Sequence, residues 1–149
     1  MVQLRDQAST DRNTRENAVH VYHMHYIVAT ESVHTTAAAC DHLLEILTSG
    51  DQVTILTVTS PSSESRDAAD AANVATARLT GACELAFKQR EGEPAAEIEK
   101  TADTLNADVI LVGIHSGQAG TGPDLGRTAQ AVIESVSIPT VILQLEPLA

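Results

Sequence analysis

The sequence predicts a doubly wound α/β fold in which five parallel strands lie in the order 3-2-1-4-5. Two observations lead to this prediction. The apolar runs Val109–Val112 and Val141–Leu143 show no polar alternation, which is typical of parallel strands that helices cover on both faces. Segments with helical spacing alternate with such runs from residue 22 to 145, and this alternation indicates a parallel sheet with right-handed crossovers.

The first half of the chain predicts strand, helix and strand. Tyr26–Ala29 is an apolar run, and Ser32 or Thr35 can cap the helix that follows it. This helix carries apolar side chains at helical spacing and ends where Gly50 can take the left-handed conformation. Gln52–Thr59 is the second strand. The apolar positions of the helix are Ala37, Cys40, Leu44 and Leu47.

The second half continues the alternation and places the third strand at an edge of the sheet. A helix over Arg66–Leu79 ends before Gly81, and the short strand after it has one polar face, which favours an edge position. Pro94 suits the first position of the next helix, and Asn106 suits its C-cap. The remaining elements are the strand 109–112, a helix over 126–135 with Ala129, Val132, Ile133 and Val136 on one stripe, and the last strand, 140–145.

Composition favours one soluble domain. A chain of 149 residues can bury a core without disulfide or metal staples, and Cys40 and Cys83 are interpreted as buried thiols. Residues 1–20 are polar and lack periodicity, so we expect a flexible N-terminal arm followed by a domain over 21–149. No run approaches the length of a membrane span and no export signal is recognisable, which predicts a cytoplasmic location.

The charge balance excludes some classes of partner. The chain has 20 acidic and 9 basic residues, a formal net charge of −11, and such a surface repels nucleic acid and anionic membranes. Lysine occurs only at Lys88 and Lys100. An acidic, lysine-poor composition predicts adaptation to high salt, where counterions screen the self-repulsion of the protein; an ordinary acidic protein is the alternative.

Three histidines near the first strand are candidate metal ligands. His20, His23 and His25 are close in sequence, but no carboxylate or thiol stands near them to complete a ligand set. On a strand, His23 and His25 share a face with Ile27. A polar beginning of the strand is therefore the favoured interpretation, and no metal site is predicted.

The segment between the fourth strand and the last helix predicts an anion site. It begins at Gly113, is rich in glycine, and leads into the helix at Gly126. Ligands of open α/β sheets bind at the carboxyl ends of strands, and the N–H groups of a helix N-terminus favour an anion. A phosphate could therefore bind the backbone N–H groups of Gly126, Arg127 and Thr128.

The motif of this segment resembles the nucleotide-binding end of the universal stress protein family. Gly113-Ile114-His115-Ser116 is followed by nine residues and then Gly126-Arg127, which is similar to the family pattern G-x-x-G, nine residues, G-[S/T]. The resemblance extends over about residues 22–145 and implies an adenine nucleotide alpha-hydrolase-like fold that binds ATP or AMP with Mg²⁺. Ser116 replaces a motif glycine, with Gly117 one place later, and Arg127 replaces the small hydroxyl residue.

The resemblance also implies roles for residues outside the motif. Glu31 stands where the family has an aspartate that contacts the nucleotide, and the backbone of Val58 stands where the family holds adenine. A carboxylate that stabilises a helix N-terminus is the alternative role of Glu31. Arg127 and His115 could take over the part that the motif hydroxyl plays in binding phosphate.

Two functions are expected from these observations. The first is a stress-response binding protein for an adenine nucleotide, and the second is a dimer that lacks nucleotide and acts through protein contacts. Both include a homodimer through the edge strand Thr140–Leu145, since an apolar edge needs a cover. No catalytic residue is predicted, because G-x-S-x-G and P-loop motifs are absent; His115 is the one candidate for slow ATP hydrolysis.

Overall fold

The computed structural model describes residues 22–59, 66–115 and 125–145. The predicted arm, residues 1–20, and with it His20, lie outside the described residues. Five parallel strands form one sheet in the order β4-β3-β2-β5-β6, which confirms the predicted order 3-2-1-4-5. The strands are β2 (His25–Ala29), β3 (Gln52–Thr59), β4 (Glu84–Glu91), β5 (Val109–Gly113) and β6 (Thr140–Leu143).

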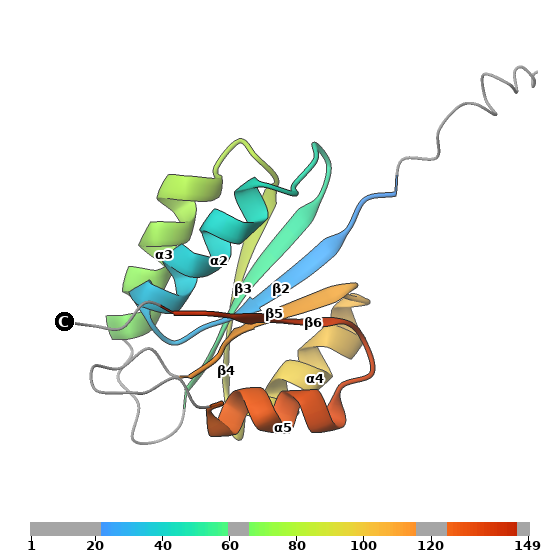
Figure 1. Ribbon diagram of the computed structural model, residues 1–149. Coiled ribbons are helices and arrows are strands. Elements are labelled where there is room, and N and C mark those ends of the chain that lie inside the picture. The colour runs from blue at the N-terminus through green and yellow to red at the C-terminus, as the bar shows by residue number, and fades with distance from the viewer. Residues whose placement is uncertain (1–21, 60–65, 116–124, 146–149) are drawn as a thin grey trace, which may run out of the picture.

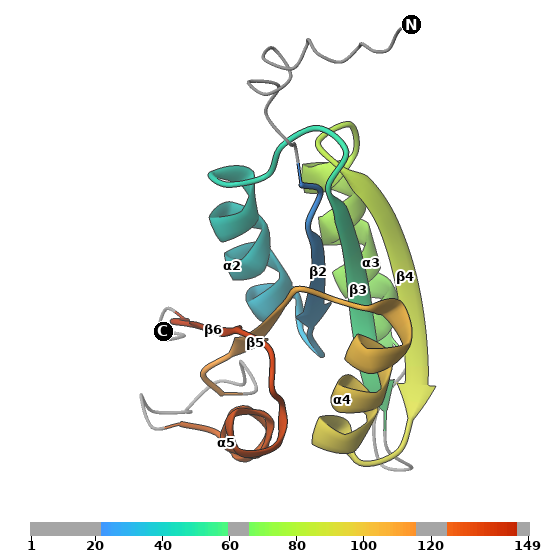
Figure 2. The same cartoon turned by 90° about the vertical axis from the view of Figure 1, so that its right-hand side faces the viewer.

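Four helices cover the sheet on both faces. One face carries α2 (Val33–Leu44) and α3 (Arg66–Leu79), and the other carries α4 (Pro94–Leu105) and α5 (Arg127–Ser135) (Figures 1 and 2). Successive residues of a strand point to opposite faces, so each strand supplies two cores. Two layers of helices with a sheet between them explain why β2, β3 and β5 are buried over most of their length, whereas the edge strand β4 is mostly exposed.

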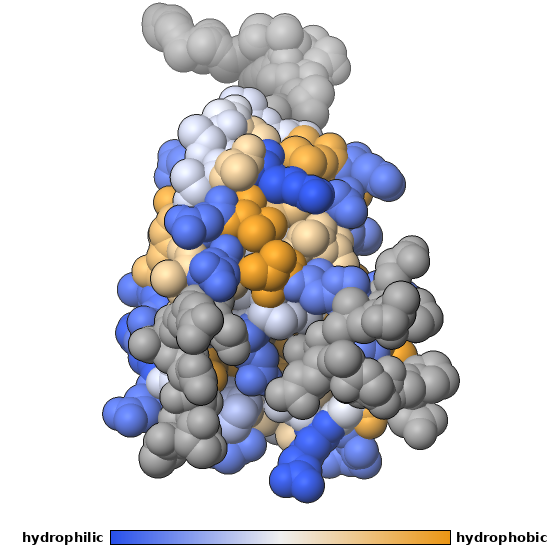
Figure 3. Space-filling model, turned by 90° about the vertical axis from the view of Figure 1, so that its left-hand side faces the viewer, coloured by the Kyte–Doolittle hydropathy of each residue, from blue (hydrophilic) through white to orange (hydrophobic). Residues whose placement is uncertain are grey.

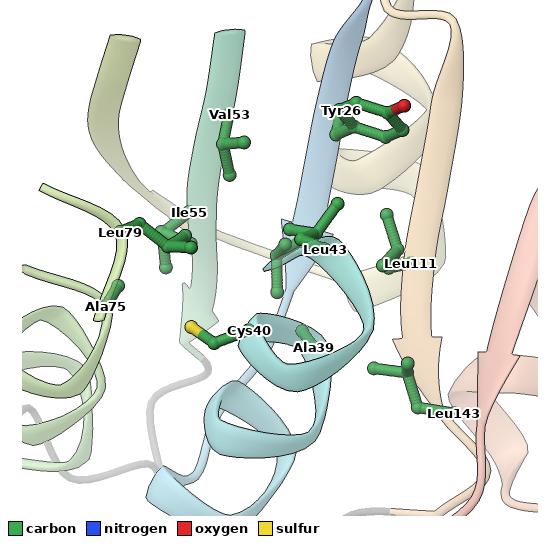
Figure 4. Close-up of a cluster of buried hydrophobic side chains, with 11 residues drawn as sticks. Tyr26, Ala39, Cys40, Leu43, Val53, Ile55, Ala75, Leu79, Leu111 and Leu143 are labelled. Carbon is green, nitrogen blue, oxygen red and sulfur yellow. The ribbon is translucent and has the colours of Figure 1, made fainter. Parts of the chain in front are cut away.

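The larger core lies between the sheet and the pair α2 and α3. Ala39, Cys40 and Leu43 of α2 pack in this core with strand residues such as Ile55 and Leu111 (Figure 4). The second core joins Ile27, Ile110 and Val112 to α4 and α5. Cys40 is fully buried, as predicted, and this burial raises the pKa of its thiol to about 11; Cys83 is half-buried.

Helix α2 corrects one prediction. It ends at Leu44 rather than near Ser49, because Glu45 is the C-cap and the next residues form a turn. The buried face is Thr35, Thr36, Ala39, Cys40 and Leu43, whereas Leu44, which the helical spacing assigned to the core, is 47% exposed. Figure 3 shows hydrophobic residues among hydrophilic ones on this side of the molecule. Ile133 of α5, also assigned to a buried stripe, is 49% exposed.

The remaining helix signals agree with the structure. Pro94 begins α4, Glu93 is its N-cap, and Asn106 is its C-cap in the left-handed conformation, with φ 52°. Strand β4 lies at an edge of the sheet, as expected. Within the described part of the chain, no helix is long and apolar enough to cross a bilayer.

The amino ends of the strands are tied together by two aspartates. Asp51, 2% exposed, accepts hydrogen bonds from the backbone N–H groups of Met24 and Thr48, each at 2.9 Å, and from the Thr48 hydroxyl. Asp108 accepts one from the backbone N–H of His25 at 2.8 Å. Burial alone would raise the pKa of Asp51, but its hydrogen bonds and the nearby His23 outweigh burial and lower the pKa.

The histidines at this end of the sheet have structural partners. Nε2 of His25 lies 2.8 Å from Oγ1 of Thr54, and a side chain on Gly50 would collide with the ring of His23. Among the described residues, no group of three His, Cys, Asp or Glu side chains is placed to hold a metal ion. The arrangement of His23 and His25 is that of a polar beginning of a strand.

The Asp51 hydrogen bonds predict a pH-dependent contribution to stability. Replacing Asp51 with Asn should lower the free energy of unfolding at pH 7 by about 2 kcal/mol, because a buried ionised acceptor is removed. A lowered pKa in the folded state means that this contribution is complete above the ordinary value of 3.8 and disappears as the pH falls through the folded-state value. Urea unfolding at pH 7 and pH 3 should therefore show a smaller effect of Asp51→Asn at pH 3.

Asp103→Asn, at an exposed position of α4, is the control and should change stability little at either pH. An Asp51→Asn protein as stable as the unmodified protein at pH 7 would contradict the assignment.

Candidate nucleotide pocket

A cavity of about 270 Å³ opens at the carboxyl ends of β2, β3 and β5. Leu56 and Val58 of β3 line it on one side, and Gly113 of β5 lines it on the other. The N-terminal turns of α2, α4 and α5 complete the wall. The other lining residues are Ala29, Thr30, Glu31, Thr35, Pro94, Ile98, Val112, His115, Gly126, Arg127, Thr128 and Ala129.

The pocket has an apolar end and a polar end. Leu56 and Val58, with Pro94 and Ile98 of α4, make the β3 side apolar. The β5 side consists of glycine backbone, His115 and the first turn of α5. Because β2 lies between β3 and β5, a ligand that touches both sides passes over the end of β2, where Glu31 lies.

Hydroxyl groups fix the turn that carries Glu31. The Thr30 hydroxyl donates to the backbone O of Ser32 at 2.9 Å and lies 3.0 Å from that of Thr36. The Thr36 hydroxyl donates to the same carbonyl at 2.8 Å, and the backbone N–H of Thr30 donates to Leu56 O at 3.0 Å. Thr30, Thr35 and Thr36 are all buried, so buried hydroxyl groups stabilise the turn while Glu31 remains exposed.

The two ends of the segment after β5 meet at Gly126. The backbone N–H of Gly126 donates to Ile114 O at 2.6 Å, and the N–H of Ile114 donates to Leu143 O of β6 at 2.8 Å. A Cβ atom on Gly126 would lie 3.0 Å from the Cα of His115, and one on Gly113 would lie 2.9 Å from the His115 backbone O. Both glycines are required by close approach of backbone, since any side chain would push the ends apart.

Helix α5 begins without a side-chain cap. Gly126 is the N-cap and has no side chain to offer, and the first turn contains no acidic residue. By contrast, the Ser32 side chain caps α2 and the Glu93 side chain caps α4. The first N–H groups of α5 therefore face the pocket with the positive end of the helix dipole and the Arg127 side chain beside them.

Arg127 and Glu31 are the charged side chains that line this cavity. Arg127 is exposed, and its guanidinium forms no ion pair with any carboxylate in the described part of the chain. Glu31 could supply one oxygen to a cation such as Mg²⁺, which binds nucleotide sites through one or two carboxylates and the phosphates. The positive charge of Arg127 therefore suits an anion, and the Glu31 carboxylate suits a sugar hydroxyl or a cation beside that anion.

The structure brings most of the predicted site residues together. Glu31, Val58, Gly113, His115, Gly126, Arg127 and Thr128 all line the same pocket. Ser116 and Gly117 lie outside the described residues. The sequence did not identify Thr35, Pro94 or Ile98 as lining residues. Pro94 and Ile98 could have been predicted as lining residues. Strand β4 pairs in parallel with β3, so the helix that follows β4 starts beside the carboxyl end of β3.

The five-stranded, doubly wound parallel sheet with this pocket at its carboxyl edge is an adenine nucleotide alpha-hydrolase-like fold. The model of the universal stress protein family matches residues 24–144, and the chain belongs to this family. No curated protein matches the chain in sequence at a significant level.

Solved structures support the same fold at low sequence identity. Hypothetical protein MJ0577 is 18% identical, with a TM-score of 0.70, 86% of this chain covered and 100% of the other. A universal stress protein in complex with cAMP is 19% identical, with a TM-score of 0.63 and coverage of 85% and 100%. A family member from Arabidopsis thaliana with AMP bound is 14% identical, with a TM-score of 0.53 and coverage of 83% and 92%.

The close approach at Gly126 predicts a cost for a single methyl group. Replacing Gly126 with Ala should lower the free energy of unfolding by about 1–3 kcal/mol, because the new Cβ meets the backbone of His115 and Ile114. Urea unfolding measures this cost. Ser135→Ala, at the other end of α5, is the control and should cost less than about 1 kcal/mol; an unchanged Gly126→Ala protein would mean that the approach is not tight.

Proposed function

We propose that the protein is a stress-response regulator that binds an adenine nucleotide, ATP or AMP, in this pocket. The observation that carries the proposal is the pairing of an apolar wall on β3 and α4 with an uncapped helix N-terminus on the β5 side. A purine needs the first surface and a phosphate needs the second.

The pocket suggests an orientation for the nucleotide. The base would pack against Val58, Leu56 and Ile98, the ribose would lie near Glu31, and the phosphate would bind the first turn of α5 with Arg127 beside it. Strand order supports this arrangement, since β2 lies between β3 and β5. Related structures with cAMP, dAMP and AMP bound support an adenine ligand.

Arg127 provides the first test of nucleotide binding. Purified protein should release adenine nucleotide on denaturation, and the emptied protein should bind ATP or AMP in calorimetry at high KCl. Arg127→Ala should weaken the binding about 10- to 100-fold, because a charge-assisted hydrogen bond to phosphate is removed. Arg90→Ala, on the exposed strand β4, is the matched control and should bind as the unmodified protein does. Absence of nucleotide and of heat up to millimolar ligand would refute nucleotide binding.

The second candidate function is a dimer that acts through protein contacts. Strand β6 is an edge of the sheet and carries no charged side chain. The carbonyls of Pro139, just before β6, and of Leu143 accept hydrogen bonds from Ile110 and Ile114. The alternate residues Thr140 and Ile142 therefore direct their backbone groups outward. Such an edge is suited to pair with its copy in a second subunit.

A proline tests this edge without touching the ladder to β5. Ile142→Pro removes an outward N–H group, so a homodimer that uses β6 should become monomeric in light scattering coupled to size-exclusion chromatography. Ile142→Val keeps the N–H group and should remain dimeric. A dimer that survives Ile142→Pro in a folded protein would place the interface elsewhere, and a monomeric unmodified protein would rule out the homodimer.

Several finer expectations belong to this proposal. We propose no catalytic role for the pocket; among its described lining residues, His115 is our candidate for proton transfer to or from a bound nucleotide. A cytoplasmic location, adaptation to high salt and further protein partners stay predictions, as does the participation of Mg²⁺.

A further inference from the structure

The Thr35 hydroxyl is buried at the wall of the pocket. Thr35 lies in the first turn of α2, is 3% exposed and lines the cavity. Its backbone N–H donates to the Ser32 Oγ at 3.0 Å, and the Ser32 hydroxyl in turn donates to Thr35 Oγ1 at 3.0 Å. The Thr35 oxygen therefore accepts a hydrogen bond within the helix cap. The proton of the Thr35 hydroxyl points away from Ser32.

The hydrogen bonds of the turn leave this proton without an acceptor among the described residues. The Thr30 and Thr36 hydroxyls both donate to Ser32 O, and the Ser32 hydroxyl donates to Thr35. No described group accepts from Thr35 Oγ1. Buried hydroxyl groups normally have a partner for their proton, and the pocket is the space next to this one.

Thr35 lies at the polar end of the pocket. Its Oγ1 and Cγ2 atoms are each 3.2 Å from the place where a Cβ of Gly113 would be, so the glycine lets this side chain approach the end of β5. The backbone O of His115 is 2.9 Å from the same place. Thr35 is thus beside the segment that leads to the uncapped turn of α5, and away from the apolar wall on β3.

We propose that the Thr35 hydroxyl donates a hydrogen bond to an anionic phosphate oxygen of the bound nucleotide. The residue at the first position of α5 is Arg127, so the hydroxyl donor comes from the opposite helix, α2, while Arg127 supplies positive charge. The hydroxyl is pre-oriented because Ser32 holds its oxygen. This inference rests on the proposed function and adds to it a residue that sets the preference for a phosphorylated ligand.

The test compares AMP with adenosine, which lacks the phosphate. Thr35→Val keeps the size of the side chain and removes the hydroxyl, and it should weaken AMP binding about 10- to 100-fold in calorimetry while adenosine binding is unchanged. Thr35→Ser keeps the hydroxyl and should bind AMP within about threefold of the unmodified protein. Thr101→Val, a buried threonine of α4 outside the pocket, is the matched control and should affect neither ligand.

Each alternative outcome has a separate meaning. Equal AMP affinity in Thr35→Val, or an equal weakening for adenosine in a protein with an unchanged thermal midpoint, would overturn the inference and leave the proposed function intact. An unmodified protein that binds adenosine as tightly as AMP would overturn it as well, because the phosphate would then contribute nothing. An unmodified protein that binds neither AMP, ATP nor adenosine would overturn the proposed function and this inference together.

Discussion

The central position of β2 in the parallel sheet is the constraint on which the rest of the structure depends. The sheet grows from β2 toward β3 and β4 on one side and toward β5 and β6 on the other, and because parallel strands are joined by right-handed crossovers, these two directions place helices on opposite faces. The chain places α2 and α3 on one face and α4 and α5 on the other. The helices next to β2 therefore start on opposite faces of the sheet, and the carboxyl end of β2 is left between them as a pocket.

Glycine and threonine complete the pocket in different ways. Gly113 and Gly126 permit backbone approaches that no side chain would allow, and they bring the two ends of the segment after β5 together. The buried threonines of the β2–α2 turn use their hydroxyls to satisfy the turn from inside. The polar end of the pocket therefore combines backbone N–H groups and buried hydroxyls, which are fixed in place, with the exposed side chain of Arg127.

Much of the fold could be predicted because its signals are local. The apolar strands, Pro94 at the start of α4 and Asn106 at its end are each determined by residues within a few positions. The predicted buried face of α2 was right for Cys40 but wrong for Leu44, because Leu43 enters the core beside Ala39 while Leu44 lies exposed at the end of the helix. The motif and the resemblance led to most pocket residues, whereas the sequence marked Thr35 only as a possible helix cap. Its place in the pocket follows from its neighbours in space.

Two backbone hydrogen bonds connect the pocket with the open edge of the sheet. Gly126 N–H donates to Ile114 O, and Ile114 N–H donates to Leu143 O at the end of β6. The polar end of the pocket and the edge strand β6 are thus joined by a short hydrogen-bond relay through Ile114. If the protein binds nucleotide in the pocket and pairs with a second subunit through β6, this relay couples the two events. Nucleotide binding then changes the affinity between subunits by some factor, and subunit pairing changes the affinity for nucleotide by the same factor. The fraction of protein with bound ligand and the fraction that is dimeric would then depend on each other.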